Sequence, residues 1–367
     1  MHILYFSRDY TPHDHRFLSA LAETEHHTSY LRLEKNTVVY ETRSLPEKIK
    51  TIAWRGAQST VRWFDGLGLL KDIKRILYTV RPDLVLAGPL QRSAFLIALT
   101  GYKPLVSMSW GYDLIYDAKR NALWSWVTRY TLRKSTVMVG DCKTIRNLAV
   151  GYGMPDERIV TFPWGIDLEK YSPKGDSNHA SMNQGLFTLL STRGWDPIYG
   201  TKLVAEAFIK AASTRPDIHL VMLGSGSQEE EIKRMFQRTG VINQVSTPGT
   251  INQVALPQYY HEADLYVSAS HSDGSSISLL EAMASGIPTI VSDIPGNAEW
   301  VTSGENGWLF PDGDVDALAQ KILEAVDMRN DLAQMGMRAR KLAEERADWE
   351  KNFPKLLTAF EMAMQAI

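Results

Sequence analysis

The chain of 367 residues contains a single cysteine and no long uncharged apolar run. With Cys142 alone, an internal disulfide is excluded and a reducing compartment is expected. The opening residues, MHILYFSRDY, lack the basic start and apolar stretch of a secretory signal peptide. No segment approaches the roughly 20 apolar residues that span a bilayer. We therefore expect a cytoplasmic protein without membrane-spanning segments.

Basic residues are missing from one region and concentrated in another. No lysine or arginine occurs from Ile251 to Trp300. Residues 1–150 carry 22 basic and 13 acidic residues, a net charge of +9, whereas residues 151–367 carry 18 and 29, a net charge of −11. The basic half is expected to meet an anionic partner. Because no nucleic-acid-binding motif accompanies this charge, we expect no nucleic acid and favour an anionic membrane surface or a phosphorylated substrate.

Strand-like and helix-like segments alternate along both halves of the chain, a pattern typical of α/β domains with parallel sheets. The length favours two such domains. A segment rich in Pro, Gly, Ser and Asn, Pro163 to Gly185, indicates a connection between them. We predict a first Rossmann-like domain at 1–168, a linker at 169–185, a second domain at 186–345 and a C-terminal helix at 346–367. The expected strands are 2–7, 83–88, 105–110, 136–141, 186–192, 218–224, 265–270 and 289–293.

The segment from Leu265 to Val301 carries the strongest functional pattern. It predicts a buried strand, a polar loop, a short helix at 277–285 and a second strand. The N-terminus of that helix offers backbone N–H groups that suit a phosphate. Asp273 in the loop and Glu281 in the helix flank this position, with seven residues between them. A phosphate seat beside carboxylates that accept hydrogen bonds from hydroxyls suits a nucleotide-sugar.

This pattern resembles the retaining glycosyltransferases of family four. Their motif is Glu, seven residues, Glu, then Ala-Met-Ala and Gly-x-Pro; this chain has Asp273 and Glu281, followed by Ala282-Met283-Ala284 and Gly286-Ile287-Pro288. The resemblance covers most of the chain and is strongest at 191–311. It implies a GT-B architecture, in which two Rossmann-like domains face each other across a cleft and the last helix crosses back to the first domain.

The resemblance also implies an activity. It predicts a metal-independent enzyme without a cofactor that transfers a hexose from a nucleotide diphosphate sugar, with a UDP-sugar as the expected donor and retention at the anomeric carbon. The acceptor is expected to be a glycan or a lipid-linked hydroxyl in polysaccharide biosynthesis. Two alternatives stay open: a nucleotide-sugar epimerase of GT-B fold and a two-lobed sugar-binding protein without catalysis.

Three residues receive catalytic roles from the resemblance. Arg193 is expected on the donor diphosphate, because the planar guanidinium matches phosphate oxygens. Asp273 is expected on the donor sugar and Glu281 on the nucleotide ribose, although Ser278 to Glu281 also fits a capping box. The expected donor-binding residues are Gly224, Gly226, Gly249, Thr250, Gly274, Ser278, Leu279, Leu280 and Lys202. Tyr199 stands where the family has a lysine, and whether Lys202 compensates is open.

The first domain supplies the expected acceptor side. Thr11 to Arg16 is interpreted as a loop in which Asp14 or His15 contacts the acceptor, and no metal is expected because adjacent residues rarely all turn toward one ion. Ser109 to Asp113 resembles the family's His-Gly-x-Asp, with Trp110 at the histidine position. Asp113 is a candidate cleft residue, and Trp110 stacks on a ligand or belongs to the core.

A basic and aromatic segment extends from Lys119 to Ser135. At helical spacing, Leu123, Trp126, Val127 and Tyr130 share one face, with arginines and lysines around it. This combination is typical of a helix that lies on an anionic membrane. The alternative is that the same face is buried in the domain. The segment thus predicts peripheral binding to the cytoplasmic face of a membrane or an ordinary core helix.

Overall fold

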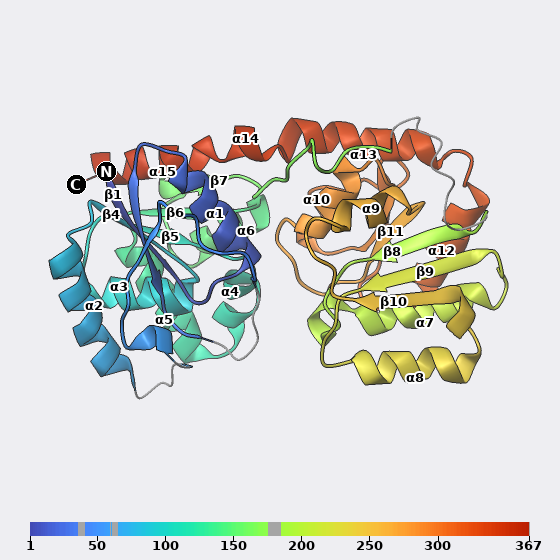
Figure 1. Cartoon of the computed structure of the whole chain (residues 1–367), viewed down its shortest axis with the longest axis horizontal. Helices are drawn as coiled ribbons and strands as arrows, with labels where there is room; N and C mark the ends of the chain where they lie inside the picture. Colours follow the sequence, from blue (N-terminus) through green and yellow to red (C-terminus); the bar gives the residue numbers. More distant parts are fainter. Residues whose placement is uncertain (36–40, 59, 61–64, 175–184, 367) are drawn as a thin grey trace. The chain divides into compact units, whose positions relative to one another are not determined.

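The computed structural model describes residues 1–35, 41–58, 60, 65–174 and 185–366. The chain divides into two compact units (Figure 1). Unit 1 consists of Met1–Phe162 and Phe353–Ile367, and unit 2 of Pro163–Asn352. The predicted linker at 169–185 lies largely outside the described residues, because 175–184 are not among them.

Unit 1 is built on a parallel sheet with the strand order β3-β2-β1-β4-β5-β6-β7. The central strands are short apolar runs buried on both faces, as expected where helices cover both sides of a parallel sheet. The strands are β1 (His2–Ser7), β2 (His27–Arg32), β3 (Lys50–Thr51), β4 (Leu84–Ala87), β5 (Leu105–Met108), β6 (Val137–Gly140) and β7 (Ile159–Thr161).

The helices of unit 1 come from both ends of the chain (Figure 1). They are α1 (Pro12–Ala22), α2 (Gly66–Val80), α3 (Phe95–Thr100), α4 (Tyr112–Ile115), α5 (Ala122–Lys134), α6 (Lys143–Gly151) and α15 (Pro354–Gln365), with short turns η1 (Gly56–Gln58), η3 (Leu90–Ala94), η4 (Asp117–Lys119) and η5 (Asp156–Arg158). The last helix, α15, packs against β4, β5, β6 and β7 and buries Leu356 and Phe360 completely. The C-terminal segment is therefore part of the first unit.

Helix α1 begins where the sequence suggested a loop. Thr11 is the N-cap, and its hydroxyl accepts from the Asp14 backbone N–H, while the Asp14 carboxylate accepts from the Thr11 N–H at 2.9 Å. This reciprocal arrangement is a capping box, and Pro12 occupies the first helical position, where its missing N–H costs nothing. The interpretation of 11–16 as a loop was wrong, because these residues form the first turn of a helix.

Unit 2 contains a parallel sheet with the order β10-β9-β8-β11-β12-β13. Leu189 and its neighbour Leu190 on the central strand belong to two different apolar clusters, one for each face. The strands are β8 (Phe187–Ser191), β9 (Ile218–Leu223), β10 (Val245–Gly249), β11 (Leu265–Ser268), β12 (Thr289–Ser292) and β13 (Gly307–Phe310). The helices are α7 (Thr201–Ala212), α8 (Glu229–Thr239), α9 (Leu256–His261), α10 (Ile277–Ala284), α11 (Pro295–Ala298), α12 (Val315–Asp327), α13 (Leu332–Arg346) and α14 (Trp349–Asn352), with η6 (Pro197–Tyr199) and η7 (Ile242–Gln244).

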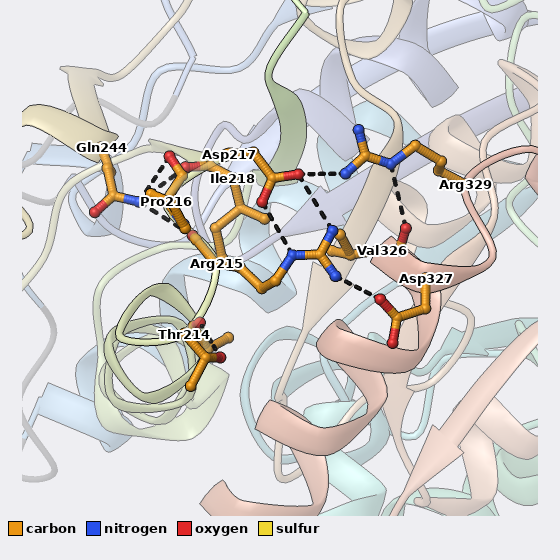
Figure 2. A network of polar contacts seen from close by, with 10 residues as sticks. Thr214, Arg215, Pro216, Asp217, Ile218, Gln244, Val326, Asp327 and Arg329 are labelled. Atoms are coloured by element: carbon orange, nitrogen blue, oxygen red, sulfur yellow. Dashed lines mark hydrogen bonds and ion pairs between the residues drawn. The ribbon is translucent and has the colours of Figure 1, made fainter.

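A surface ion network joins the start of β9 to the end of α12 (Figure 2). Arg215 donates from Nε to Asp217 Oδ1 at 3.0 Å and also pairs with Asp327, while Arg329 pairs with Asp217. The hydrogen bonds from Arg215 and then Arg329 hold the pKa of Asp217 well below its usual range. Because these side chains are partly solvated, the network that links the end of α12 to the segment before β9 adds little to stability.

The two sheets share a topological feature that positions the functional residues. In unit 1 the chain passes from β1 to β2 and later returns to the opposite side of β1 with β4; in unit 2 it passes from β8 to β9 and returns beside β8 with β11. Open parallel sheets bind ligands beyond the carboxyl ends of their strands at such a switch point. We therefore expect ligand-binding sites in the segments that follow β1, β4, β8 and β11.

Candidate active site

A cavity of about 360 Å³ lies at the switch point of unit 2. Its walls come from the segments that follow β8, β9, β10 and β11. The lining residues are Thr192, Arg193, Gly194, Tyr199, Leu223, Gly224, Thr250, Ile251, Gln253, Leu256, Ile277, Ser278 and Glu281. The topology thus collects, from four separate segments, several of the residues that the sequence proposed for donor binding.

Arg193 is the cation of this cavity and is held on several sides. It donates from one terminal nitrogen to Ser276 Oγ at 3.0 Å and to Ser278 Oγ at 3.1 Å, and from the other to Asp273 Oδ2 at 2.7 Å. Its guanidinium carbon lies 4.4 Å from the centre of the Tyr199 ring. Burial acts to lower the pKa of Arg193, but Asp273 and the neighbouring tyrosines leave that pKa raised. The side chain is a fixed positive charge at a strand end.

Asp273 is half-buried and lies against the same guanidinium. Burial raises the pKa of this carboxyl, and the positive charge of Arg193 opposes the rise. The ion pair joins the segment after β11 to the segment after β8 across the switch point. In this state the carboxylate neutralises Arg193, so an anionic ligand on Arg193 has to share the guanidinium with Asp273.

Glu281 lies inside the unit, with 5% of its surface exposed. Its Oε2 accepts from the Tyr260 hydroxyl at 2.9 Å, and the same hydroxyl lies 3.2 Å from Thr192 Oγ1. The alternative of a capping box formed by Ser278 and Glu281 is wrong, because the helix starts at Ile277 with Ser276 as N-cap and shows no side-chain cap bond. Glu281 therefore presents a carboxylate to the cavity, with one oxygen oriented by a tyrosine.

The N-terminus of α10 supplies fewer amides than the sequence suggested. The Leu280 N–H donates to the Ser276 carbonyl at 3.0 Å, the first bond of the helical ladder. The side chains of Leu279 and Leu280 are buried in an apolar cluster, and neither residue lines the cavity. The amides of Ile277, Ser278 and Leu279 precede the ladder, so any phosphate contact from this helix end belongs to them.

The expected glycines have a local explanation. A Cβ on Gly224 would lie 2.9 Å from the Arg193 carbonyl oxygen, and one on Gly226 would lie 2.5 Å from the Trp195 carbonyl carbon. These glycines therefore permit the segments after β8 and β9 to touch, which sets the position of Arg193. Gly224 and Thr250 line the cavity, whereas Gly226, Gly249 and Gly274 do not.

Lys202 does not line this cavity. Its Nζ pairs with Glu231 on α8 at 2.6 Å, and the residue is absent from the cavity wall. The position expected for a family lysine is occupied by Tyr199, whose ring stacks against Arg193. Three further residues, Tyr260, Tyr266 and Ser276, orient Glu281, Ser278 and Arg193, and no sequence signal marked them.

The family model for glycosyl transferases group 1 matches residues 182–342, the part of the chain that contains this cavity. This part of the chain belongs to that family. The solved structure of Anabaena HepE in complex with UDP resembles the chain with a TM-score of 0.79 at 16% identity, covering 98% of this chain and all of HepE. This likeness confirms the predicted α/β fold class of GT-B type.

Two curated relatives of the group 1 glycosyltransferase domain extend the comparison. A GDP-mannose-dependent alpha-(1-6)-phosphatidylinositol monomannoside mannosyltransferase of Mycolicibacterium smegmatis is 24% identical over 302 residues, covering 78% of this chain and 75% of the relative. The GtfA subunit of a UDP-N-acetylglucosamine–peptide N-acetylglucosaminyltransferase of Streptococcus gordonii is 32% identical over 109 residues, covering 29% of this chain and 21% of GtfA. The chain thus matches only a fifth of the length of GtfA.

The residues expected on the acceptor side lie in unit 1. Asp14 is buried, and its Oδ1 accepts from the Tyr5 hydroxyl at 3.1 Å. Asp113 is buried as well and accepts from the Leu90 N–H at 2.9 Å and from the Ser109 hydroxyl at 2.5 Å. Burial raises the pKa of each carboxyl to about 6, although these hydrogen bonds oppose the rise. Both carboxylates hold backbone segments at the carboxyl edge of the sheet.

The other two acceptor-side candidates are only partly buried. His15 Nδ1 lies 2.7 Å from the Tyr10 hydroxyl, and the Trp110 ring lies 5.5 Å from that of His13. Asp14 points toward Tyr5, so the three adjacent residues 13–15 do not converge. Among the described residues, no group of three or more His, Cys, Asp or Glu side chains is placed to hold a metal ion.

Helix α5 does not bury the face that the sequence pattern singled out. Its buried residues are Thr128, Thr131 and Leu132. Leu123 is 65% exposed and Trp126 is 52% exposed, while the Trp126 ring stacks on that of Tyr130. Across the described ranges, no helix is both long enough and apolar enough to cross a membrane. Leu123 and Trp126 therefore lie on the surface of unit 1, whereas Tyr130 of the same face packs against the core.

Proposed function

We propose that the protein is a retaining glycosyltransferase that moves a hexose from a UDP-sugar to a hydroxyl of a glycan or of a lipid-linked acceptor. The observation that carries this proposal is the cavity at the switch point, where Arg193, Ser278 and Glu281 converge. A guanidinium and helix-end amides suit a diphosphate, and a buried carboxylate suits ribose hydroxyls. The UDP complex of HepE, a protein of the same fold, supports uracil as the base.

The proposed chemistry needs charge stabilisation more than a nucleophile. The acceptor oxygen forms a bond to the anomeric carbon while the glycosyl–phosphate bond breaks. The electron pair of the broken glycosyl–phosphate bond stays on the leaving diphosphate, which also receives the acceptor proton. Arg193 stabilises the negative charge that develops there, because a preorganised donor in a partly dry site needs little reorganisation. When the diphosphate binds, it shares Arg193 with Asp273, whose carboxylate then turns toward the sugar.

The donor is tested by calorimetry on the full chain with UDP, UDP-glucose, GDP and GDP-mannose. We expect saturable binding of the uridine ligands, lost in Glu281→Gln. Glu324→Gln is the matched control, because Glu324 is also a helix carboxylate that accepts from an aromatic side chain, Trp308, at 3.2 Å and lies away from the cavity. Selective binding of GDP-mannose would correct the base, and equal affinity in Glu281→Gln would remove Glu281 from the site.

The transfer step is tested by identifying the products, because an epimerase would release an isomerised donor instead of a glycosylated acceptor. The relatives named above are transferases, which does not favour the epimerase alternative. A transferase consumes donor only when an acceptor is present and forms an α-linked product from an α-linked donor. Release of an isomerised UDP-sugar without acceptor would establish the epimerase instead. We further propose that the reaction needs no metal ion, so activity is expected to persist with excess chelator.

We also propose that unit 1 binds an anionic membrane through α5. The exposed face of Leu123 and Trp126, with Arg129, Arg133 and Lys134 on the same helix, supports this location at a cytoplasmic membrane surface. Cosedimentation with anionic vesicles is expected at low salt and lost at high salt. Replacement of Leu123 and Trp126 by serine is expected to reduce it.

The matched control for the membrane test uses a second exposed apolar pair. Leu67 and Tyr78 on α2 are 86% and 75% exposed, so their replacement by serine removes a comparable apolar surface elsewhere on unit 1. Equal loss of vesicle binding in both double variants would show unspecific hydrophobic adsorption. A wild-type protein that stays in solution with anionic vesicles at low salt would contradict the membrane location.

A further inference from the structure

Charged residues follow the carboxyl ends of neighbouring strands at the switch point of unit 1, and the proposed reaction leaves them unused. Arg8 follows β1, and Arg92 lies in η3, which follows β4. Asp117 and Arg120 lie beyond the end of β5, the next strand of the sheet. Because parallel strands end at one edge, residues far apart in the sequence gather there.

Two of these arginines share one aromatic ring. The guanidinium carbons of Arg92 and Arg120 each lie 5.4 Å from the centre of the Trp124 ring, near the start of α5. Cation–π contacts orient the planar groups but do not neutralise them. Within the described part of the chain, neither guanidinium lies within 4.0 Å of a carboxylate. The Trp124 ring therefore orients two guanidinium groups that have no ion-pair partner among the described residues.

The neighbouring carboxylates compensate this charge only in part. Glu34, which follows β2, pairs with Arg8, and Asp117 lies within electrostatic range of Arg8, Arg92 and Arg120. Burial, followed by the like charge of Arg8, lowers the pKa of Arg92. Three guanidinium groups and two carboxylates thus lie within electrostatic range of one another at this end of the sheet. A bound anion stabilises a group of neighbouring like charges.

We propose that Arg8, Arg92 and Arg120 form a phosphate-binding site, with Trp124 as the platform that orients the two unpaired arginines. The planar guanidinium matches two oxygens of a phosphate, and three arginines suit a monoester or diphosphate better than a single carboxylate. The site lies wholly within unit 1 and is separate from the cavity that contains Arg193.

The phosphate belongs to the acceptor, an assignment that rests on the proposed glycosyltransferase function. Tyr112 and Tyr116, 46% and 52% exposed, stack at 5.0 Å and offer an aromatic surface in the segment between β5 and α5 that also contains Arg120. A phosphate next to an aromatic surface matches a glycan or lipid whose hydroxyl-bearing part is linked through phosphate. Anion binding itself is independent of that function.

The test uses inorganic pyrophosphate and calorimetry at fixed ionic strength, on the full chain with Arg193→Ala. This background removes the main cation of the other cavity, so the remaining binding reports on unit 1. We expect binding that weakens by about tenfold or more when Arg92→Gln and Arg120→Gln are added, because each charge-assisted contact is lost. The double variant Arg92→Lys with Arg120→Lys keeps the positive charges but loses the planar guanidinium groups. Its pyrophosphate affinity is expected to lie between that of the Arg193→Ala background and that of the double Arg→Gln variant.

A matched double variant controls for net charge. Lys71→Gln with Lys74→Gln removes two positive charges from the exposed side of α2, elsewhere on unit 1, and is expected to leave pyrophosphate affinity unchanged. Unchanged melting temperatures exclude misfolding as the cause of any loss. Equal affinity in the Arg92/Arg120 and Lys71/Lys74 variants would overturn the site.

A second arm distinguishes a free phosphate from a lipid headgroup. Phosphatidylcholine vesicles with and without phosphatidic acid are cosedimented with the same variants. Loss of phosphatidic-acid-dependent binding in the Arg92/Arg120 variant alone, without measurable pyrophosphate binding, assigns the site to a lipid phosphate. Pyrophosphate binding without vesicle binding assigns it to a soluble phosphorylated acceptor. Absence of both overturns the proposal, and since neither arm measures transfer, the outcome is independent of whether the chain is a glycosyltransferase.

Discussion

The switch points of the two units place arginines at corresponding positions but surround them with different charges. In unit 2, Arg193 follows β8 and is matched by Asp273 from the segment after β11. In unit 1, Arg8 follows β1 and is matched by Glu34, but Arg92 from the segment after β4 adds a charge that pairs with no carboxylate among the described residues. The strand order fixes where a site forms, and the local balance of charge decides how strongly the site attracts an anion before one is bound.

The two units also differ in what shifts the pKa of their carboxyl groups. The largest expected effect on stability comes from a buried carboxyl group of unit 1. Burial raises the pKa of Asp14 from 3.8 to about 6, so the folded protein holds this proton more tightly than the unfolded chain. Its favourable contribution is present below about pH 4 and is lost as the pH rises to about 6. The shift corresponds to about 3 kcal/mol. Asp14→Asn is therefore expected to gain stability over wild type as the pH rises from 4 to 7, measured by urea unfolding.

Asp217 in unit 2 provides the control of opposite sign. Its pKa lies below the usual range because of Arg215 and Arg329, so its contribution is present above about pH 4 and is lost on acidification. Asp14→Asn and Asp217→Asn are thus expected to change the pH dependence in opposite directions. Parallel pH profiles for wild type and Asp14→Asn would show that the carboxyl is not perturbed by burial.

Arg193→Ala is expected to lower turnover by about tenfold to a hundredfold, which is the loss of one charge-assisted contact of roughly 1.5–3 kcal/mol. Binding of uridine, which has no phosphate, is expected to change little. Arg215→Ala is the matched control, because Arg215 is also paired with an aspartate at a sheet edge but lies in the surface network. Wild-type turnover of Arg193→Ala on its true substrates would remove Arg193 from the diphosphate site.

Tyr199 is expected to have a smaller effect, exerted through Arg193. Loss of the ring in Tyr199→Leu removes a cation–π contact worth about 0.5–2 kcal/mol, or roughly twofold to thirtyfold in rate. Tyr199→Phe keeps the ring and is expected to retain the rate. The fall is expected in kcat more than in KM for the donor. Equal losses in both variants would place the effect on the hydroxyl instead.

The surface network of unit 2 is expected to give the smallest effect. Asp217→Asn breaks contacts to Arg215 and Arg329, but the aspartate side chain is 37% exposed, so screening limits the cost to less than about 1 kcal/mol. The loss is expected to shrink further in high salt, as measured by thermal unfolding. A larger, salt-independent loss would show that the end of α12 depends on this network.

Much of the fold could be predicted from periodicity, and the exceptions have physical reasons. The eight predicted strands all appear, with ends shifted by at most two residues. The five that were missed, β2, β3, β7, β10 and β13, are short or polar, and most lie at or near a sheet edge. β10 contains Pro248 and Gly249, which weaken any strand pattern and are tolerated at an edge.

The sequence by itself determined two parallel α/β units and the segment from Asp273 to Pro288, because both depend on residue order and spacing over short distances. Tertiary structure alone decided which charges meet. Arg193 reaches Asp273 across 80 residues, and Lys202, only nine residues from Arg193, turns to Glu231 instead. Strand order rather than chain order brings these ends together, and burial raises the pKa of Asp14 and Asp113. Neither can be read from the residues one segment at a time.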